Sequence, residues 1–73
     1  MRIEVNVEKF KNDKEYYNRK YCNYILDSWE RYHAAMVKKL QKLKRQSSLD
    51  VYEQWRDYAE ENIAKIKDVM SYL

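Results

Sequence analysis

The chain has 73 residues, with 15 Lys or Arg against 12 Asp or Glu, one Cys, one His and neither Gly nor Pro. This length allows one small domain, predicted over residues 1–73, while a single Cys and a single His exclude an internal disulfide and leave too few ligands for a metal site. No apolar run approaches the length of a transmembrane helix and the N-terminus lacks the apolar core of a signal peptide, so we expect a cytoplasmic protein without cofactor or membrane contact.

Residues 2–8, RIEVNVE, are predicted to form a β-strand because apolar and polar residues alternate strictly. Ile3, Val5 and Val7 would face one side and the polar residues the other. No other segment has this pattern, and a lone strand leaves its backbone groups unpaired. We therefore expect the strand to pair with its copy in a homodimer or to extend a partner's sheet. The alternative is an extended arm whose aliphatic residues pack on the helices.

Residues 13–45 are predicted to form one long helix with one buried face. Asn12 is its predicted N-cap, and Asp13 lies in its first turn. The apolar residues recur at intervals of three or four and are Tyr21, Ile25, Trp29, Tyr32, Met36, Leu40 and Leu43. Cys22 and His33 lie beside this stripe, and we interpret both as core residues.

Residues 49–71 are predicted to form a second, shorter helix after a turn at residues 46–49. Its heptad stripe consists of Tyr52, Trp55, Ala59, Asn62, Ile66, Val69 and Leu73. Asn62, the polar member, is predicted to set the register or to lie at the rim of the core. Because the turn is short, the predicted fold class is mainly α: an antiparallel hairpin of two helices, preceded by the strand or arm.

The first helix is predicted to span about 50 Å and the second about 35 Å, so the start of the first should project beyond its partner. Tyrosines crowd this projecting part, and Tyr beside Lys or Arg is typical of binding surfaces. The candidate partner-binding residues are Tyr17, Lys20, Tyr21, Tyr24 and Arg31. The same residues could instead cover the arm, line a dimer interface or stack on exposed bases.

The end of the first helix is strongly basic. Residues 1–46 carry 12 Lys or Arg against 6 Asp or Glu, whereas residues 47–73 carry 3 against 6. An antiparallel hairpin sets the basic run beside these acids, so internal compensation is one interpretation. The others are contact with an acidic protein surface and binding to nucleic-acid phosphates. The candidate phosphate-binding residues are Lys38, Lys39, Lys42, Lys44 and Arg45.

No sequence pattern predicts catalysis. The carboxylates lie on helix faces predicted to be solvated, and the chain has no glycine to form a phosphate-binding loop. Cys22 and His33 are separated by about 16 Å along a helix, too far for a nucleophile–base pair or a shared metal ion. We therefore expect a protein that is not an enzyme.

In size and composition the chain resembles small phage-encoded inhibitors, including anti-CRISPR proteins. The resemblance implies stoichiometric binding to a nucleic-acid-handling complex. We therefore expect a homodimeric binding protein whose partner is a larger protein or protein–nucleic-acid complex. The alternative is a small basic DNA- or RNA-binding dimer of the transcriptional-regulator type, and a third class is a self-assembling structural protein.

Overall fold

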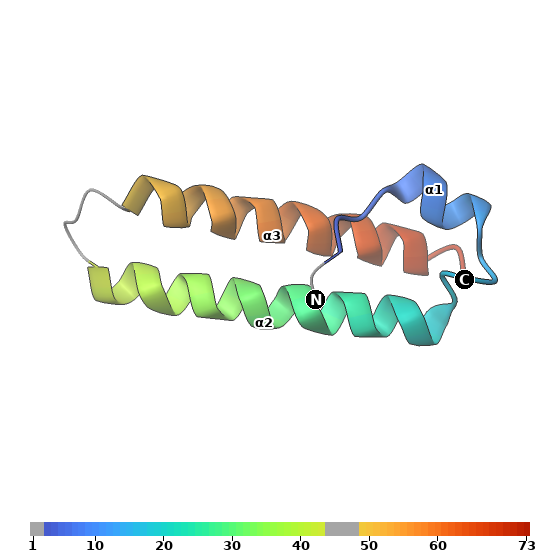
Figure 1. Ribbon diagram of the computed structural model, residues 1–73, viewed down its shortest axis with the longest axis horizontal. Helices are drawn as coiled ribbons and strands as arrows, with labels where there is room; N and C mark the ends of the chain where they lie inside the picture. The colour runs from blue at the N-terminus through green and yellow to red at the C-terminus, as the bar shows by residue number, and fades with distance from the viewer. Residues whose placement is uncertain (1–2, 44–48) are drawn as a thin grey trace.

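The computed structural model describes residues 3–43 and 49–73. Within them three helices follow one another: α1 (Val7–Asn12), α2 (Arg19–Leu43) and α3 (Leu49–Met70). The two long helices run side by side in opposite directions, and α1 packs against α3 near the end of the hairpin that holds the C-terminus (Figure 1). The predicted mainly helical hairpin is therefore confirmed.

The hairpin forms because each long helix has one apolar face. The side chains that are at most 3% exposed include Cys22, Ile25 and Trp29 on α2 and Ala59, Ile66 and Val69 on α3. Full burial of a large aliphatic or aromatic side chain contributes about 1.5–3 kcal/mol. The 3.6-residue periodicity of the sequence therefore determines which faces of α2 and α3 meet.

The predicted N-terminal strand is not found in the described residues. Residues 3–6 are extended without belonging to a sheet, and the last two residues of the predicted strand already lie in α1. The Asn6 side chain accepts a hydrogen bond from the Lys9 amide at 3.0 Å and thereby caps α1. An extended arm, the alternative prediction, describes residues 3–6, and we call them the N-terminal arm.

The first long helix starts later than predicted. α2 begins at Arg19 rather than at residue 13, and residues 14–17 form a turn. The Asn18 side chain accepts a hydrogen bond from the Tyr21 amide at 3.0 Å, so Asn18 caps α2. The predicted cap, Asn12, is instead the last residue of α1. Apolar spacing alone predicted one helix over residues 13–45. Short polar side chains that hydrogen-bond to nearby backbone amides interrupt it.

The remaining boundaries lie close to the predicted ones. α2 is described as far as Leu43, and the predicted helical residues 44–45 lie outside the described part of the chain. α3 covers Leu49–Met70, against a prediction of residues 49–71.

The core is concentrated in the half of the hairpin that faces the N-terminal arm. Phe10 of α1 stacks on Tyr17, with ring centroids 3.8 Å apart and an interplanar angle of 8°. The buried members of this cluster are Val5, Phe10, Tyr17, Cys22, Ile25, Trp29, Ala59, Ile66 and Val69. The arm and α1 therefore supply a third layer over one end of the two-helix hairpin.

Candidate partner-binding surface

Two side-chain hydrogen bonds hold the N-terminal arm on the hairpin. The Val5 amide donates to Oδ1 of Asn62 at 2.8 Å, and Nε1 of Trp29 donates to the Ile3 carbonyl oxygen at 2.8 Å. Nδ2 of Asn62 donates in turn to the Tyr58 carbonyl oxygen at 2.9 Å. Asn62 is 0% exposed, so its buried amide satisfies a backbone group that a neighbouring strand would otherwise pair.

Tyr17 belongs to the core rather than to the predicted binding surface. Its side chain is 8% exposed and stacks on Phe10, and its carbonyl oxygen accepts a hydrogen bond from the Cys22 thiol at 3.4 Å. The expected overhang of bare helix is not formed, because the arm and α1 fold back over this end of the hairpin (Figure 1). Among the predicted residues near the start of α2, Lys20 and Tyr24 are exposed.

Three tyrosines form a ladder of ring contacts at the start of α2. The ring centroids of Tyr16 and Tyr21 are 5.4 Å apart, and those of Tyr21 and Tyr24 are 6.5 Å apart. Tyr16 and Tyr24 are each 57% exposed, and Tyr21 is half-buried between them. Tyr21 and Tyr24 also line a shallow hollow with Asn18 and Lys20. We call Tyr16, Tyr21 and Tyr24 the tyrosine ladder.

Tyr16 is absent from the residues predicted to bind a partner. In a continuous helix from residue 13, its side chain would point about 140° away from that of Tyr21. The turn at residues 14–17 removes this separation and brings the two rings into contact. Apolar spacing therefore could not predict that Tyr16 belongs to the ladder. That prediction would have required the position of the helix cap at Asn18.

The ladder also affects the hydroxyl of Tyr21. Desolvation, a hydrogen bond with Tyr16 and the neighbouring tyrosines together raise the pKa of Tyr21 above its ordinary value of 10.0. Tyr21 is therefore protonated at neutral pH, as an ordinary tyrosine is.

The face of α2 that points away from α3 continues from the ladder towards the turn of the hairpin. We call this face the α2 outer face, and its exposed residues are Lys20, Tyr24, Arg31, Lys38 and Lys42. Their intervals of 4, 7, 7 and 4 residues keep them in one stripe along the helix. The predicted partner-binding and phosphate-binding residues therefore share one continuous surface. Arg31 forms an ion pair on it with Asp27, at 3.0 Å.

The other predicted phosphate-binding residues do not join this stripe. Nζ of Lys39 lies 5.3 Å from the ring centroid of Tyr52 on α3, in a cation–π contact between the helices. Lys44 and Arg45 lie outside the described residues.

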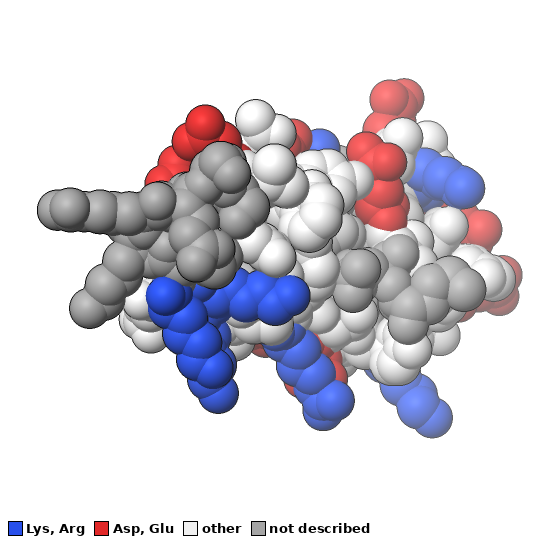
Figure 2. Space-filling model, turned by 60° about the vertical axis from the view of Figure 1, so that its left-hand side comes forward, with Lys and Arg blue, Asp and Glu red and all other residues white. Residues whose placement is uncertain are grey.

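Charge is divided between the two long helices. α2 carries six Lys or Arg and two Asp or Glu, whereas α3 carries three and six. In Figure 2 the Lys and Arg side chains lie mainly along one edge of the molecule and the Asp and Glu side chains mainly along the other. The predicted internal compensation is not formed by Lys38, Lys39 or Lys42, because none of them makes an ion pair with a carboxylate of the described residues.

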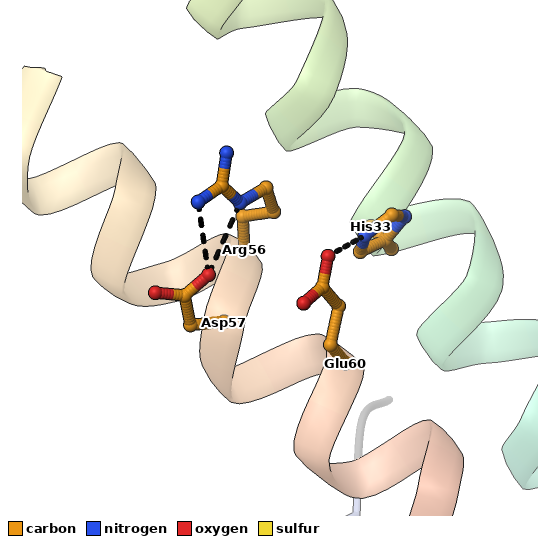
Figure 3. A network of polar contacts seen from close by, with 4 residues as sticks. All are labelled: His33, Arg56, Asp57 and Glu60. Atoms are coloured by element: carbon orange, nitrogen blue, oxygen red, sulfur yellow. Dashed lines mark hydrogen bonds and ion pairs between the residues drawn. The ribbon is translucent and has the colours of Figure 1, made fainter.

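In the described part of the chain, a side-chain hydrogen bond between His33 and Glu60 joins α2 to α3. Nε2 of His33 lies 3.0 Å from Oε1 of Glu60 (Figure 3). The His33 side chain is 29% exposed, so His33 lies at the rim of the core and not within it as predicted. Nearby on α3, the hydrogen bonds from Arg56 to Oδ1 of Asp57, at 3.1 and 3.0 Å, raise the pKa of the Arg56 guanidinium.

Cys22 is a buried core residue, as predicted. Desolvation raises the pKa of its thiol above the ordinary 9.0, and a protonated, buried thiol is a poor nucleophile. Within residues 3–43 and 49–73, no three His, Cys, Asp or Glu side chains are grouped as metal ligands. No helix in the same residues is long and apolar enough to cross a bilayer.

No family model, curated protein or solved structure matches this chain. Its function must therefore be inferred from the surfaces described above.

Proposed function

We propose that this chain is a non-enzymatic protein that binds a larger macromolecule in a stoichiometric complex, through the tyrosine ladder and the α2 outer face. The observation that carries the proposal is the 57% exposure of both Tyr16 and Tyr24, beside the exposed Lys20. Such a cluster exposes apolar area that a helix facing water ordinarily does not carry. Tyr next to Lys or Arg can bury this area against a partner while its hydroxyl remains hydrogen-bonded.

The cations of the α2 outer face indicate the chemistry of the partner. Lys38 and Lys42 make no ion pair with a described carboxylate, whereas Arg31 forms an ion pair with Asp27. An acidic protein surface would be attracted to this face, while the tyrosine rings would supply buried area. In its most specific form, the proposal is a cytoplasmic phage or mobile-element inhibitor, of the anti-CRISPR type, directed at a nucleic-acid-handling complex.

Affinity capture from the source organism tests this proposal. The wild-type chain and a Tyr16→Ala, Tyr24→Ala double variant serve as baits, and the captured protein is then purified for direct titration. We expect the wild type to bind it in a fixed ratio and the double variant to bind at least about tenfold more weakly, as for hot-spot tyrosines. Equal binding by both baits would show that the ladder is the wrong surface.

The matched control is Tyr72→Ala. Tyr72 is 56% exposed, but its ring lies against Lys11 of α1, with Nζ 3.7 Å from the ring centroid, rather than in the ladder. This variant removes a similar exposed ring and should bind the captured protein as the wild type does. Circular dichroism should show unchanged helix content in all three proteins.

A second candidate function is a small DNA- or RNA-binding module of the transcriptional-regulator type. The α2 outer face favours it, because Lys20, Arg31, Lys38 and Lys42 follow one line of about 33 Å along the helix. A line of cations of this length can contact several phosphates, and Tyr24 can stack on an unpaired base.

A mobility-shift experiment with labelled duplex and single strands tests this second function. We expect a shift at micromolar protein that weakens steeply as salt rises, and a loss of the shift in a Lys38→Glu, Lys42→Glu variant. Lys67→Glu, which reverses an exposed charge on α3, should leave the shift unchanged. The absence of a wild-type shift at about 50 mM salt would exclude direct nucleic-acid binding.

A further inference from the structure

An apolar stripe lies exposed on α3, in the half of the hairpin next to the turn. Val51, Trp55 and Tyr58 are 43%, 45% and 39% exposed, and their spacing of four and three residues places them on one helix face. The next position of the same stripe is Asn62, which is fully buried where it binds the N-terminal arm. We call Val51, Trp55 and Tyr58 the α3 stripe.

The α3 stripe belongs to the face of the hairpin that holds the arm. The Tyr58 ring contacts the Trp29 ring with centroids 5.4 Å apart, and Nε1 of Trp29 donates to the carbonyl oxygen of Ile3. Tyr58 is therefore where the arm-covered half of this face meets the exposed half. The α3 stripe thus continues the face that the arm covers, but its own side chains are exposed.

The two borders of the α3 stripe carry opposite charges. Lys39 and Lys42 lie on the α2 side, where Lys42 also belongs to the α2 outer face. Asp50 and Asp57 lie on the α3 side, where Asp57 also accepts hydrogen bonds from Arg56. Figure 2 shows a surface without charged side chains, with Lys and Arg below it and Asp and Glu above it. Within residues 3–43 and 49–73, no ion pair joins these two borders.

We propose that the α3 stripe is the docking site for a second copy of this chain. A two-fold axis along the hairpin would place α2 of one copy over α3 of the other. The basic border of each copy would then face the acidic border of the other, while the two stripes bury each other only in the half next to the turn, because the arm and α1 cover the other half of the same face in both copies. A polyanion such as nucleic acid, or an anionic membrane, would instead meet the carboxylates of α3.

This pairing differs from the strand pairing expected from the sequence, because the arm is already bound to Asn62 and Trp29 of its own chain. At exposures of 45% and 39%, Trp55 and Tyr58 offer on the order of 150–200 Å² of apolar area per copy. Stable dimers bury about 800 Å² per partner, so the charged borders must supply much of the contact. We therefore expect a weak dimer that forms only at high protein concentration.

Sedimentation equilibrium over about 5–500 µM tests the pairing. The mass of the wild type should rise from 9.1 kDa towards twice that value, while Trp55→Glu should remain monomeric throughout. Tyr24→Glu is the matched control, because Tyr24 is also exposed but lies in the tyrosine ladder, and it should dimerise as the wild type does. A monomeric wild type, or a Trp55→Glu protein that still dimerises, would overturn the proposal.

A second measurement does not depend on the folding of the Trp55→Glu variant. Trp29 is buried at 3% exposure, so quenching of the wild-type fluorescence by acrylamide reports mainly on Trp55. Quenching should decrease as the protein concentration rises through the range in which the mass increases. Quenching that does not change over this range would show that association leaves the stripe exposed, and the proposed surface would be wrong.

Charge reversal tests the arrangement of the two copies. A Lys39→Glu, Lys42→Glu variant and an Asp50→Lys, Asp57→Lys variant should each self-associate at least tenfold more weakly than the wild type. Mixed in equal amounts, the two variants should form a heterodimer, because each copy then supplies the border that the other lacks. If the mixture stays monomeric, α2 of one copy does not lie over α3 of the other.

Discussion

The buried amide of Asn62 connects the N-terminal arm to α3. Its Oδ1 accepts the hydrogen bond of the Val5 amide and its Nδ2 donates to the Tyr58 carbonyl oxygen. The first bond is buried and the second is partly buried, and an unpaired buried backbone amide costs about 1–3 kcal/mol. The Asn62 side chain therefore supplies the hydrogen-bond acceptor that a neighbouring β-strand would offer to the Val5 amide in a sheet.

We predict that Asn62→Leu lowers the free energy of unfolding by about 1–3 kcal/mol, because the buried Val5 amide loses its acceptor. Urea denaturation measures this change. Asn23→Leu, at an exposed position of α2, is the control and should change stability by less than about 0.5 kcal/mol. If both variants unfold at the same urea concentration, the arm does not depend on the amide.

The pKa values of Cys22 and Tyr21 predict a loss of stability at alkaline pH. Folding raises both values above the ordinary 9.0 and 10.0, so both groups stay protonated when folded while the unfolded chain ionises first. The free energy of unfolding should therefore be independent of these groups below about pH 8 and fall as pH rises through 9 and 10. Urea midpoints between pH 7 and 10.5 should show this fall, and it should be smaller in Cys22→Ala. Identical pH profiles for the two proteins would contradict the role of the thiol.

At the scale of the elements, the helix caps decide where α1 and α2 begin. Apolar spacing continues through residues 13–45, but Asn6 and Asn18 each bind a backbone amide three residues later and start a new helix. The break at residues 14–17 allows Tyr17 to stack on Phe10, and it brings Tyr16 into the tyrosine ladder. The candidate binding surface therefore exists because the long helix is interrupted.

We predict that Asn18→Ala costs about 0.5–2 kcal/mol, because the first turn of α2 loses its side-chain acceptor. Asn12→Ala is the matched control, since Asn12 ends α1 and caps no helix in this structure. Thermal unfolding followed by circular dichroism measures both. A larger loss in Asn12→Ala than in Asn18→Ala would favour the uninterrupted helix.

At the scale of the whole molecule, the two ends of the hairpin differ in their packing. The end next to the arm has three layers and contains the buried core cluster, whereas the α3 stripe is exposed near the turn. Charge is divided across the width of the hairpin, with a basic α2 and an acidic α3. The molecule thus presents a basic tyrosine-bearing face on α2 and an apolar stripe with borders of opposite charge.

Native-state hydrogen exchange should reveal this difference. Amides of α3 near Ile66 should exchange at least about tenfold more slowly than those near Trp55, because local opening is easier where fewer apolar contacts must be broken. In dilute protein this ratio should be largest, and it should shrink at concentrations where a second copy covers the α3 stripe. Uniform protection along α3 in dilute protein would contradict the uneven core.

The sequence alone determined the two long helices, most of their buried faces and their antiparallel arrangement; Trp55, predicted in the buried stripe of the second helix, is instead 45% exposed. The helices and their arrangement follow from the period of the apolar residues and a short connection, which are local properties of the chain. The sequence also placed Lys20, Tyr21 and Tyr24 on a candidate binding surface, and the structure leaves Lys20 and Tyr24 exposed.

Only the tertiary structure decided that residues 3–6 form an arm, that Tyr17 is buried and that Lys38, Lys39 and Lys42 form no ion pair with the described carboxylates of α3. The bond from Val5 to Asn62 spans 57 residues, so no local pattern contains it. The alternation of apolar and polar residues in RIEVNVE predicts which side chains are buried. It does not predict whether the backbone N–H and C=O groups of this segment form hydrogen bonds with a neighbouring strand or with side chains of the two helices. That choice depends on which groups the folded hairpin brings to the arm.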